Sequence, residues 1–262
     1  MNPLRTRLVA AAVGVGLVLA APATAWAGPR RPVSTAPTGS ESPTDADRRS
    51  IEDIRTRCLA AIDVRLPALA AARTALSANE HVTDAHQAAL EADIDETAAR
   101  LRVLADLIKA DADPASLKEH CRSIFEDNRV FALVLPRVRL VVGADAANDA
   151  GAKLRDVAAR LDDAIAKAEA RELHQPSPTG TDVRQAKLDL DMMKAHIASG
   201  VASAGSVPGA VLGLTPAAWN ADHEVLTPAR QSLRSARADL KVARDLAFKI
   251  RNELKPPASP EA

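Results

Sequence analysis

Residues 121–145 read CRSIFEDNRVFALVLPRVRLVVGAD, and they hold the longest apolar run of the chain after its leader, Val130 to Val142. Two arginines and Pro136 interrupt this run, which is too short and too charged for a bilayer-spanning helix of about 20 apolar residues. A strand fits the composition, but the chain offers no second good strand to pair with it. We therefore expect the end of one helix, a break at Leu135–Pro136, and the start of the next helix.

Helical periodicity continues on both sides of this stretch. Apolar residues recur at steps of three and four over 45–77, 83–110, 113–135, 137–173, 182–198 and 227–254. These stripes predict an all-α fold, an elongated antiparallel helical bundle with coiled-coil-like seams and five to six helices. Two three-helix lobes are one arrangement of these helices. The apolar run is then core for both lobes, with a groove for a ligand or partner as the alternative.

Local signals mark where several helices begin and end. Thr83 and Asp113 are expected N-caps, and Thr215 and Thr227 are expected to act in the same way. A proline follows each of the last three, as is typical of the first helical position. Residues 199–214, SGVASAGSVPGAVLGL, are expected to form a glycine-rich loop.

The first 27 residues predict a signal peptide. A basic start with Arg5 and Arg7 precedes an uncharged apolar run, and ATAWA supplies a small-x-small cleavage site. Cleavage after Ala27 is preferred, with cleavage after Ala25 as the alternative. The product is expected to be secreted, either extracellular or associated with the cell envelope.

The rest of the chain divides into three segments. Residues 28–44 are rich in Pro, Ser and Thr and are predicted to be a disordered linker, residues 45–255 to be the helical domain, and residues 256–262 to be a disordered tail. Removing the leader leaves 32 basic residues against 34 acidic ones. This balance argues against nucleic acid as a partner, because nucleic-acid binding needs clustered positive charge.

Two cysteines, Cys58 and Cys121, remain in the exported chain. An oxidising compartment favours one intramolecular disulfide between them. The first and third helices of an up-down-up arrangement run parallel, and helix lengths place the two cysteines at similar levels. A thiol nucleophile and an intermolecular bridge are the alternatives. Closing a loop of about 63 residues would stabilise the fold by roughly 4 kcal/mol.

Two segments, DNRVFALVLPRVRLVVGAD (127–145) and LGLTPAAWNADHEVLTPAR (212–230), together with the leader and the paired cysteines, resemble a group of exported helical proteins of actinobacteria. No activity is known for that group. The resemblance implies export, a helical fold and the disulfide, and it implies no catalytic residues.

The sequence offers few candidates for a site. The six histidines are scattered without metal-ligand spacing, and no nucleophile or phosphate-binding motif is present, so we predict no catalytic residues, no metal and no cofactor. Acidic residues such as Asp189 are expected on the wet faces of helices. Two features could contact a partner or an anionic ligand, the basic cluster and the single tryptophan after the leader: Arg122, Arg129, Arg137, Arg139 and Trp219. Helix pairing and packing against the bundle end are the competing interpretations.

These observations predict a non-enzymatic exported bundle that acts through protein or cell-envelope contacts, with a homodimer along an exposed seam as one form. A small-molecule binder or enzyme with a polar pocket between helices is the alternative. A weaker third reading is a lipid-surface binder whose amphipathic helices open onto a membrane.

Overall fold

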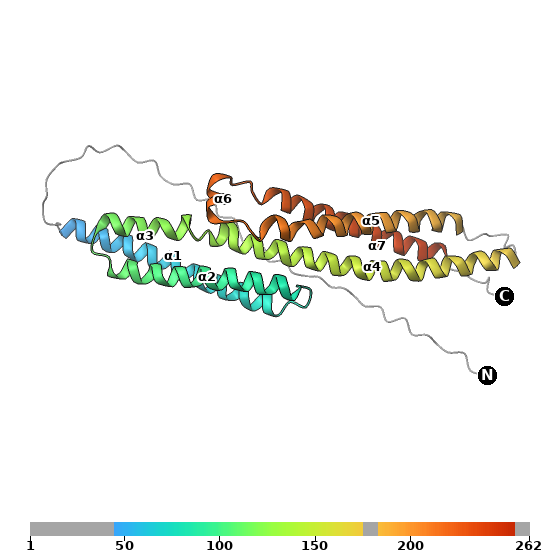
Figure 1. Ribbon diagram of the computed structural model, residues 1–262, viewed down its shortest axis with the longest axis horizontal. Coiled ribbons are helices and arrows are strands. Elements are labelled where there is room, and N and C mark those ends of the chain that lie inside the picture. Colours follow the sequence, from blue (N-terminus) through green and yellow to red (C-terminus); the bar gives the residue numbers. More distant parts are fainter. Residues whose placement is uncertain (1–44, 175–182, 255–262) are drawn as a thin grey trace, which may run out of the picture. The chain divides into compact units, whose positions relative to one another are not determined.

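The computed structural model describes residues 45–174 and 183–254, and the elements within them are all helical (Figure 1). The predicted signal peptide, linker and tail lie outside these residues. The elements are α1 (Asp45–Ser77), α2 (Asp84–Ala110), α3 (Pro114–Glu126), the π-helix η1 (Val130–Val134), α4 (Leu135–His174), α5 (Val183–Val211), α6 (Pro216–Ala221) and α7 (Thr227–Glu253). The predicted all-α bundle is confirmed, with six helices of 13 residues or more in the described part of the chain.

The helices form two lobes that share α4. In the first lobe, α1, α2, α3, η1 and the start of α4 enclose one aliphatic core, which also takes in the end of α5 and the start of α7. In the second lobe, the remainder of α4 packs with α5 and α7 around a separate core. Most apolar side chains between Val130 and Val142 are buried in the first core, so this run is core and not an open groove.

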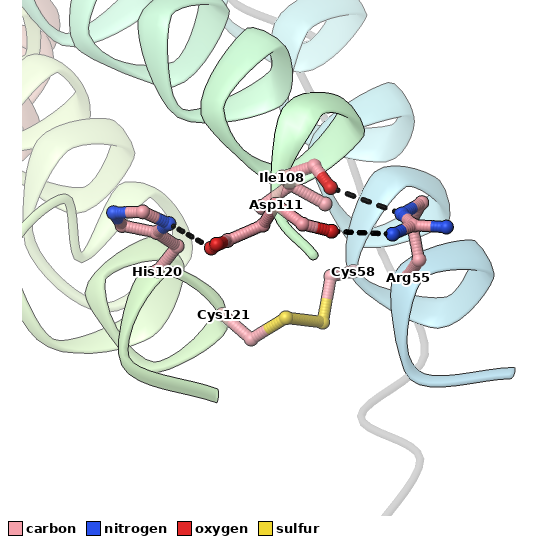
Figure 2. Close-up of a disulfide and its surroundings, with 6 residues drawn as sticks. All are labelled: Arg55, Cys58, Ile108, Asp111, His120 and Cys121. Atoms are coloured by element: carbon pink, nitrogen blue, oxygen red, sulfur yellow. Dashed lines mark hydrogen bonds and ion pairs between the residues drawn. A yellow bond between two sulfur atoms is a disulfide. The ribbon is translucent and has the colours of Figure 1, made fainter. Parts of the chain in front are cut away.

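The Cys58–Cys121 disulfide is confirmed, and it joins α1 to α3 with a Cα–Cα distance of 5.6 Å (Figure 2). The end of α2 lies beside it. Arg55 donates from Nε to the Ile108 carbonyl at 3.1 Å and from Nη2 to the Asp111 carbonyl at 2.6 Å. The Asp111 carboxylate in turn lies 2.7 Å from Nδ1 of His120 on α3. Three helices are therefore fixed to one another at this end of the first lobe.

The helix break lies earlier than predicted. Leu135 is α-helical (φ −65°, ψ −41°), and Pro136 is the second residue of α4, which follows the π-helix η1 directly, so the chain stays helical through Leu135–Pro136. Instead, α3 ends at Glu126, and Arg129 adopts a left-handed conformation (φ 37°, ψ 40°). Asn128 supports this end by donating from its side-chain amide to the Ser123 carbonyl at 3.0 Å.

The predicted glycine-rich loop at 199–214 is wrong over most of its length, because α5 continues to Val211 with Pro208 inside it. Close packing explains why glycine is used there. A Cβ at Gly200 would lie 2.9 Å from Cγ of Leu240 and 3.1 Å from the Ala236 carbonyl oxygen of α7. The small side chain therefore lets α5 and α7 approach, which outweighs the low helix propensity of glycine.

Three of the four predicted caps are confirmed. Thr83 and Thr215 accept from the third amide after them, and Asp113 accepts from Ser116 at 2.7 Å. Thr227 is different, since it is the first residue of α7 and its hydroxyl donates to the Glu224 carboxylate. Within residues 45–174 and 183–254, no helix combines the length and apolar character that a bilayer crossing needs.

Candidate functional site

The four arginines of the predicted basic cluster do not converge. Arg122 is exposed and pairs with Glu119 at 2.6 Å on its own helix, and Arg139 is exposed on α4. Arg129 is half-buried at the helix break and Arg137 is buried. An anion would need several of these guanidinium groups together, and their different burial and partners do not favour a single anion-binding cluster.

Arg137 is committed to holding elements together. Its side chain is only 4% exposed, and its Nη1 lies 2.6 Å from the Asp93 carboxylate of α2. Its Nη2 donates to the Leu214 carbonyl between α5 and α6. The residue therefore links α4, α2 and the α5–α6 connection, and this role explains an arginine within an apolar run.

Trp219 lies on α6 and packs, half-buried, against the first core, with its ring centroid 5.7 Å from that of His223. The neighbouring Asn220 accepts from Nε of Arg129 at 2.6 Å and donates to the Glu126 carbonyl at 3.1 Å. The packing interpretation of Trp219 is thus the one that the geometry favours. Through these contacts, α6 fastens the helix break in place.

The break has two unusual backbone features side by side. Arg129 is the one non-glycine residue with positive φ among the described residues, a conformation that costs on the order of 1–3 kcal/mol. The π-helix η1 follows directly, with the amides of Leu133 and Val134 both bonded to the Arg129 carbonyl. Single π-turns of this kind occur often at functional sites. The side chains that are exposed at this break are therefore candidates for a functional surface.

Two phenylalanines are exposed at the break. Phe125, near the end of α3, is 44% exposed, and Phe131, in η1, is 48% exposed. Arg65 of α1 brings them together, because its guanidinium carbon lies 4.5 Å from the ring centroid of Phe125 and 5.3 Å from that of Phe131. We call these three residues the Arg–Phe patch. The chain has only three phenylalanines, and none of them lies in the buried core. The presence of two of them together on the surface is therefore not a consequence of an excess of aromatic residues.

The Arg65 guanidinium is partly removed from water. Its Nε is buried with no hydrogen-bond partner in the described residues, while Nη1 donates to the Ala61 carbonyl at 2.7 Å. Burial lowers the pKa of this side chain from its ordinary value, since desolvation penalises the charged form. Cation–π attraction to the two rings offsets part of that penalty.

Sequence reasoning missed the Arg–Phe patch. Phe125 and Phe131 flank the segment EDNRV (126–130), which contains the unrecognised helix break, and nothing in the sequence places Arg65 beside them. The rarity of phenylalanine was the one available signal.

Four histidines lie against aspartates in ordinary structural pairs. Their Nδ1–carboxylate distances are 2.9 Å for His81–Asp149, 2.8 Å for His86–Asp145, 2.7 Å for His120–Asp111 and 2.8 Å for His196–Asp239. No group of three or more His, Cys, Asp or Glu side chains that could hold a metal ion occurs among residues that the structure describes.

Asp189 does not lie on a wet face, contrary to the prediction. It is fully buried on α5, where Lys249 lies 2.6 Å away and Gln185 donates at 3.0 Å. Burial, followed by the nearby Asp189 carboxylate, raises the pKa of Glu253, against the opposing effect of Lys249. Asp189 follows the buried Ala186 by three residues on the same helix, and this spacing was the sequence signal that Asp189 is buried.

A shallow groove of about 390 Å³ lies between α1 and α2. It is lined by apolar side chains and by charged ones of both signs: Leu59, Ile62, Asp63, Leu66, Arg102, Ala105, Asp106 and Lys109. The volume falls within the range of small-molecule sites.

Comparison with known proteins finds no matching protein family, no similar curated protein and no similar solved structure. The candidate site therefore depends on geometry alone, and the Arg–Phe patch is the strongest candidate.

Proposed function

We propose that the protein is an exported, non-enzymatic helical bundle that acts through protein or cell-envelope contacts, and that the Arg–Phe patch is its contact surface. One observation carries the proposal: two phenylalanines are about half exposed and share one partly desolvated arginine. Aromatic residues and arginine are enriched where proteins bind one another. The Cys58–Cys121 disulfide supports export, because such bonds persist in oxidising compartments.

The test is a cross-linked pull-down from envelope and culture-fluid fractions of the host, with oxidised residues 28–262 as bait. The patch variant is Phe125→Ser/Phe131→Ser. Phe248→Ser is the matched control, because Phe248 is also 50% exposed and lies 5.2 Å from the Arg251 guanidinium, yet it belongs to α7 in the second lobe.

The expected result is a set of proteins that the wild type and the Phe248→Ser control capture and the patch variant does not. Equal capture by all three baits, or no capture by the wild type, would overturn the proposal. Far-UV circular dichroism on each bait establishes that the helices remain folded.

The groove between α1 and α2 favours the alternative, a small-molecule binder. That alternative predicts that metabolites co-purify with the wild type and are lost after Leu66→Trp, which would fill the groove. Native mass spectrometry of both proteins distinguishes the two functions.

A further inference from the structure

We infer that the Arg–Phe patch recognises a segment of a partner protein in which one carboxylate lies between apolar side chains. This inference rests on the proposed function and adds the chemistry of the partner. It begins from the charge of Arg65, which the fold leaves without a counter-ion in the described residues.

Five of the described arginines are not fully exposed: Arg55, Arg65, Arg100, Arg129 and Arg137. Three of them pair with a carboxylate: Arg55 with Glu52, Arg100 with Glu96 and Arg137 with Asp93. Arg129 instead bonds the Asn220 side chain. Arg65 has only the Ala61 carbonyl and the faces of two rings within the described chain. Arg65 is thus the one of these five whose guanidinium has neither a carboxylate partner nor a hydrogen bond to another side chain within the described residues.

The arrangement favours a carboxylate over a neutral polar group. A partner that covers Phe125 and Phe131 would exclude water from the Arg65 guanidinium, and loss of water from an unpaired charge is expensive. A carboxylate placed on the remaining N–H groups would offset that loss through charge-assisted hydrogen bonds, which are strong in low-dielectric surroundings. Apolar neighbours of the carboxylate would then cover the two rings.

The patch is also unsuited to a polyanion. Of the two arginines nearest Phe125 and Phe131 in sequence, Arg122 is paired with Glu119, and Arg129 keeps its charge while it bonds the neutral Asn220 side chain. The patch itself has one guanidinium between two rings, which matches a single carboxylate, whereas anionic membranes and nucleic acids favour clusters of basic residues. Charge complementarity therefore selects a protein segment with one Asp or Glu.

The test is selection of a random 12-residue peptide display library on oxidised residues 28–262. We expect enriched peptides to carry Asp or Glu flanked by large apolar residues, and to be retained by the Phe248→Ser control. Phe125→Ser/Phe131→Ser should abolish enrichment. Arg65→Gln should remove the acidic preference while apolar residues persist.

A quantitative comparison follows with the best enriched peptide and its acid-to-amide version. The amide peptide should bind the wild type about tenfold more weakly, and Arg65→Gln should weaken the acidic peptide by a similar factor. The amide peptide should bind Arg65→Gln at least as tightly as it binds wild type, because covering an unpaired guanidinium is costly and the variant has no such charge. Equal affinities for the acid and amide peptides, or no enrichment that depends on the phenylalanines, overturn the inference.

Vesicles of phosphatidylcholine with and without phosphatidylglycerol provide the opposing arm. If the wild type binds either kind of vesicle and Phe125→Ser/Phe131→Ser does not, the patch is a lipid-binding surface and the inferred peptide partner is refuted. The two proposals fail separately. If partners are lost with Phe125→Ser/Phe131→Ser but kept with Arg65→Gln, the proposed function stands and the inferred carboxylate in the partner is refuted. If partners are kept with Phe125→Ser/Phe131→Ser, the proposed function itself is refuted.

Discussion

Replacement of Gly151 by alanine tests how closely α4 and α5 pack in the second lobe. A Cβ on Gly151 would lie 2.3 Å from Cγ2 of Val201, a distance that real Cβ atoms essentially never show. Valine in a helix has one strongly preferred χ1 rotamer, so the methyl group cannot turn away freely. The helices themselves must therefore move apart, or Val201 must adopt a strained rotamer.

The magnitude follows from two opposing effects. Gly→Ala in a helix interior contributes about 1 kcal/mol of stability, while overpacking costs about 1–3 kcal/mol. We expect Gly151→Ala to destabilise the protein by up to about 2 kcal/mol. Gly205→Ala is the matched control, because Gly205 is also inside a helix but has nothing within 4 Å of the added methyl group. It should stabilise the protein by about 1 kcal/mol.

Urea unfolding of the oxidised protein, followed by far-UV circular dichroism, measures both changes. Adding Val201→Ala to Gly151→Ala removes the clashing methyl groups, so the double variant should be more stable than the sum of the two single changes predicts. If Gly151→Ala and Gly205→Ala stabilise the protein equally, the close approach of α4 and α5 is refuted.

Three further outcomes are expected. Cys58→Ser/Cys121→Ser should lower the free energy of unfolding by up to about 4 kcal/mol in non-reducing buffer, since the open chain regains loop entropy, and wild type with reductant should match it. Arg137→Met should cost about 2–3 kcal/mol, because it leaves the Asp93 carboxylate and the partly buried Leu214 carbonyl without their donor. Urea unfolding measures this cost, and an unchanged midpoint contradicts it. Hydrogen bonds from Ser199 and then His196 lower the pKa of Asp239, so its stabilising contribution is present above the ordinary carboxyl pKa and lost as pH falls through the lowered value. Asp239→Asn should therefore be less stable than wild type at pH 6, and the difference should shrink as pH falls below the ordinary carboxyl pKa in acid-titrated urea unfolding.

The candidate site was less predictable than the fold. The sequence pointed to arginines near the apolar run because they are close together along the chain, but Arg137 faces inward and Arg139 faces outward on the same helix. Arg65 lies 60 residues before Phe125, on another helix, and no local pattern records that they meet. A surface patch made by three separate elements depends on how those elements pack, so periodicity within any one of them cannot reveal it.

The sequence by itself determined the helices, most of their caps and the disulfide partners. These features depend on residues three or four positions apart, on a side chain bonding the nearest amides, and on there being only two cysteines to pair. Tertiary structure decided whether a glycine-rich segment stays helical, where α3 ends, and which side of the break faces water. Gly200 is helical because α7 lies against it, and Arg129 takes its left-handed conformation where Asn220 of α6 holds it. In both places a contact between distant parts of the chain outweighs a local backbone preference, which is about 1 kcal/mol for Gly200 and about 1–3 kcal/mol for Arg129.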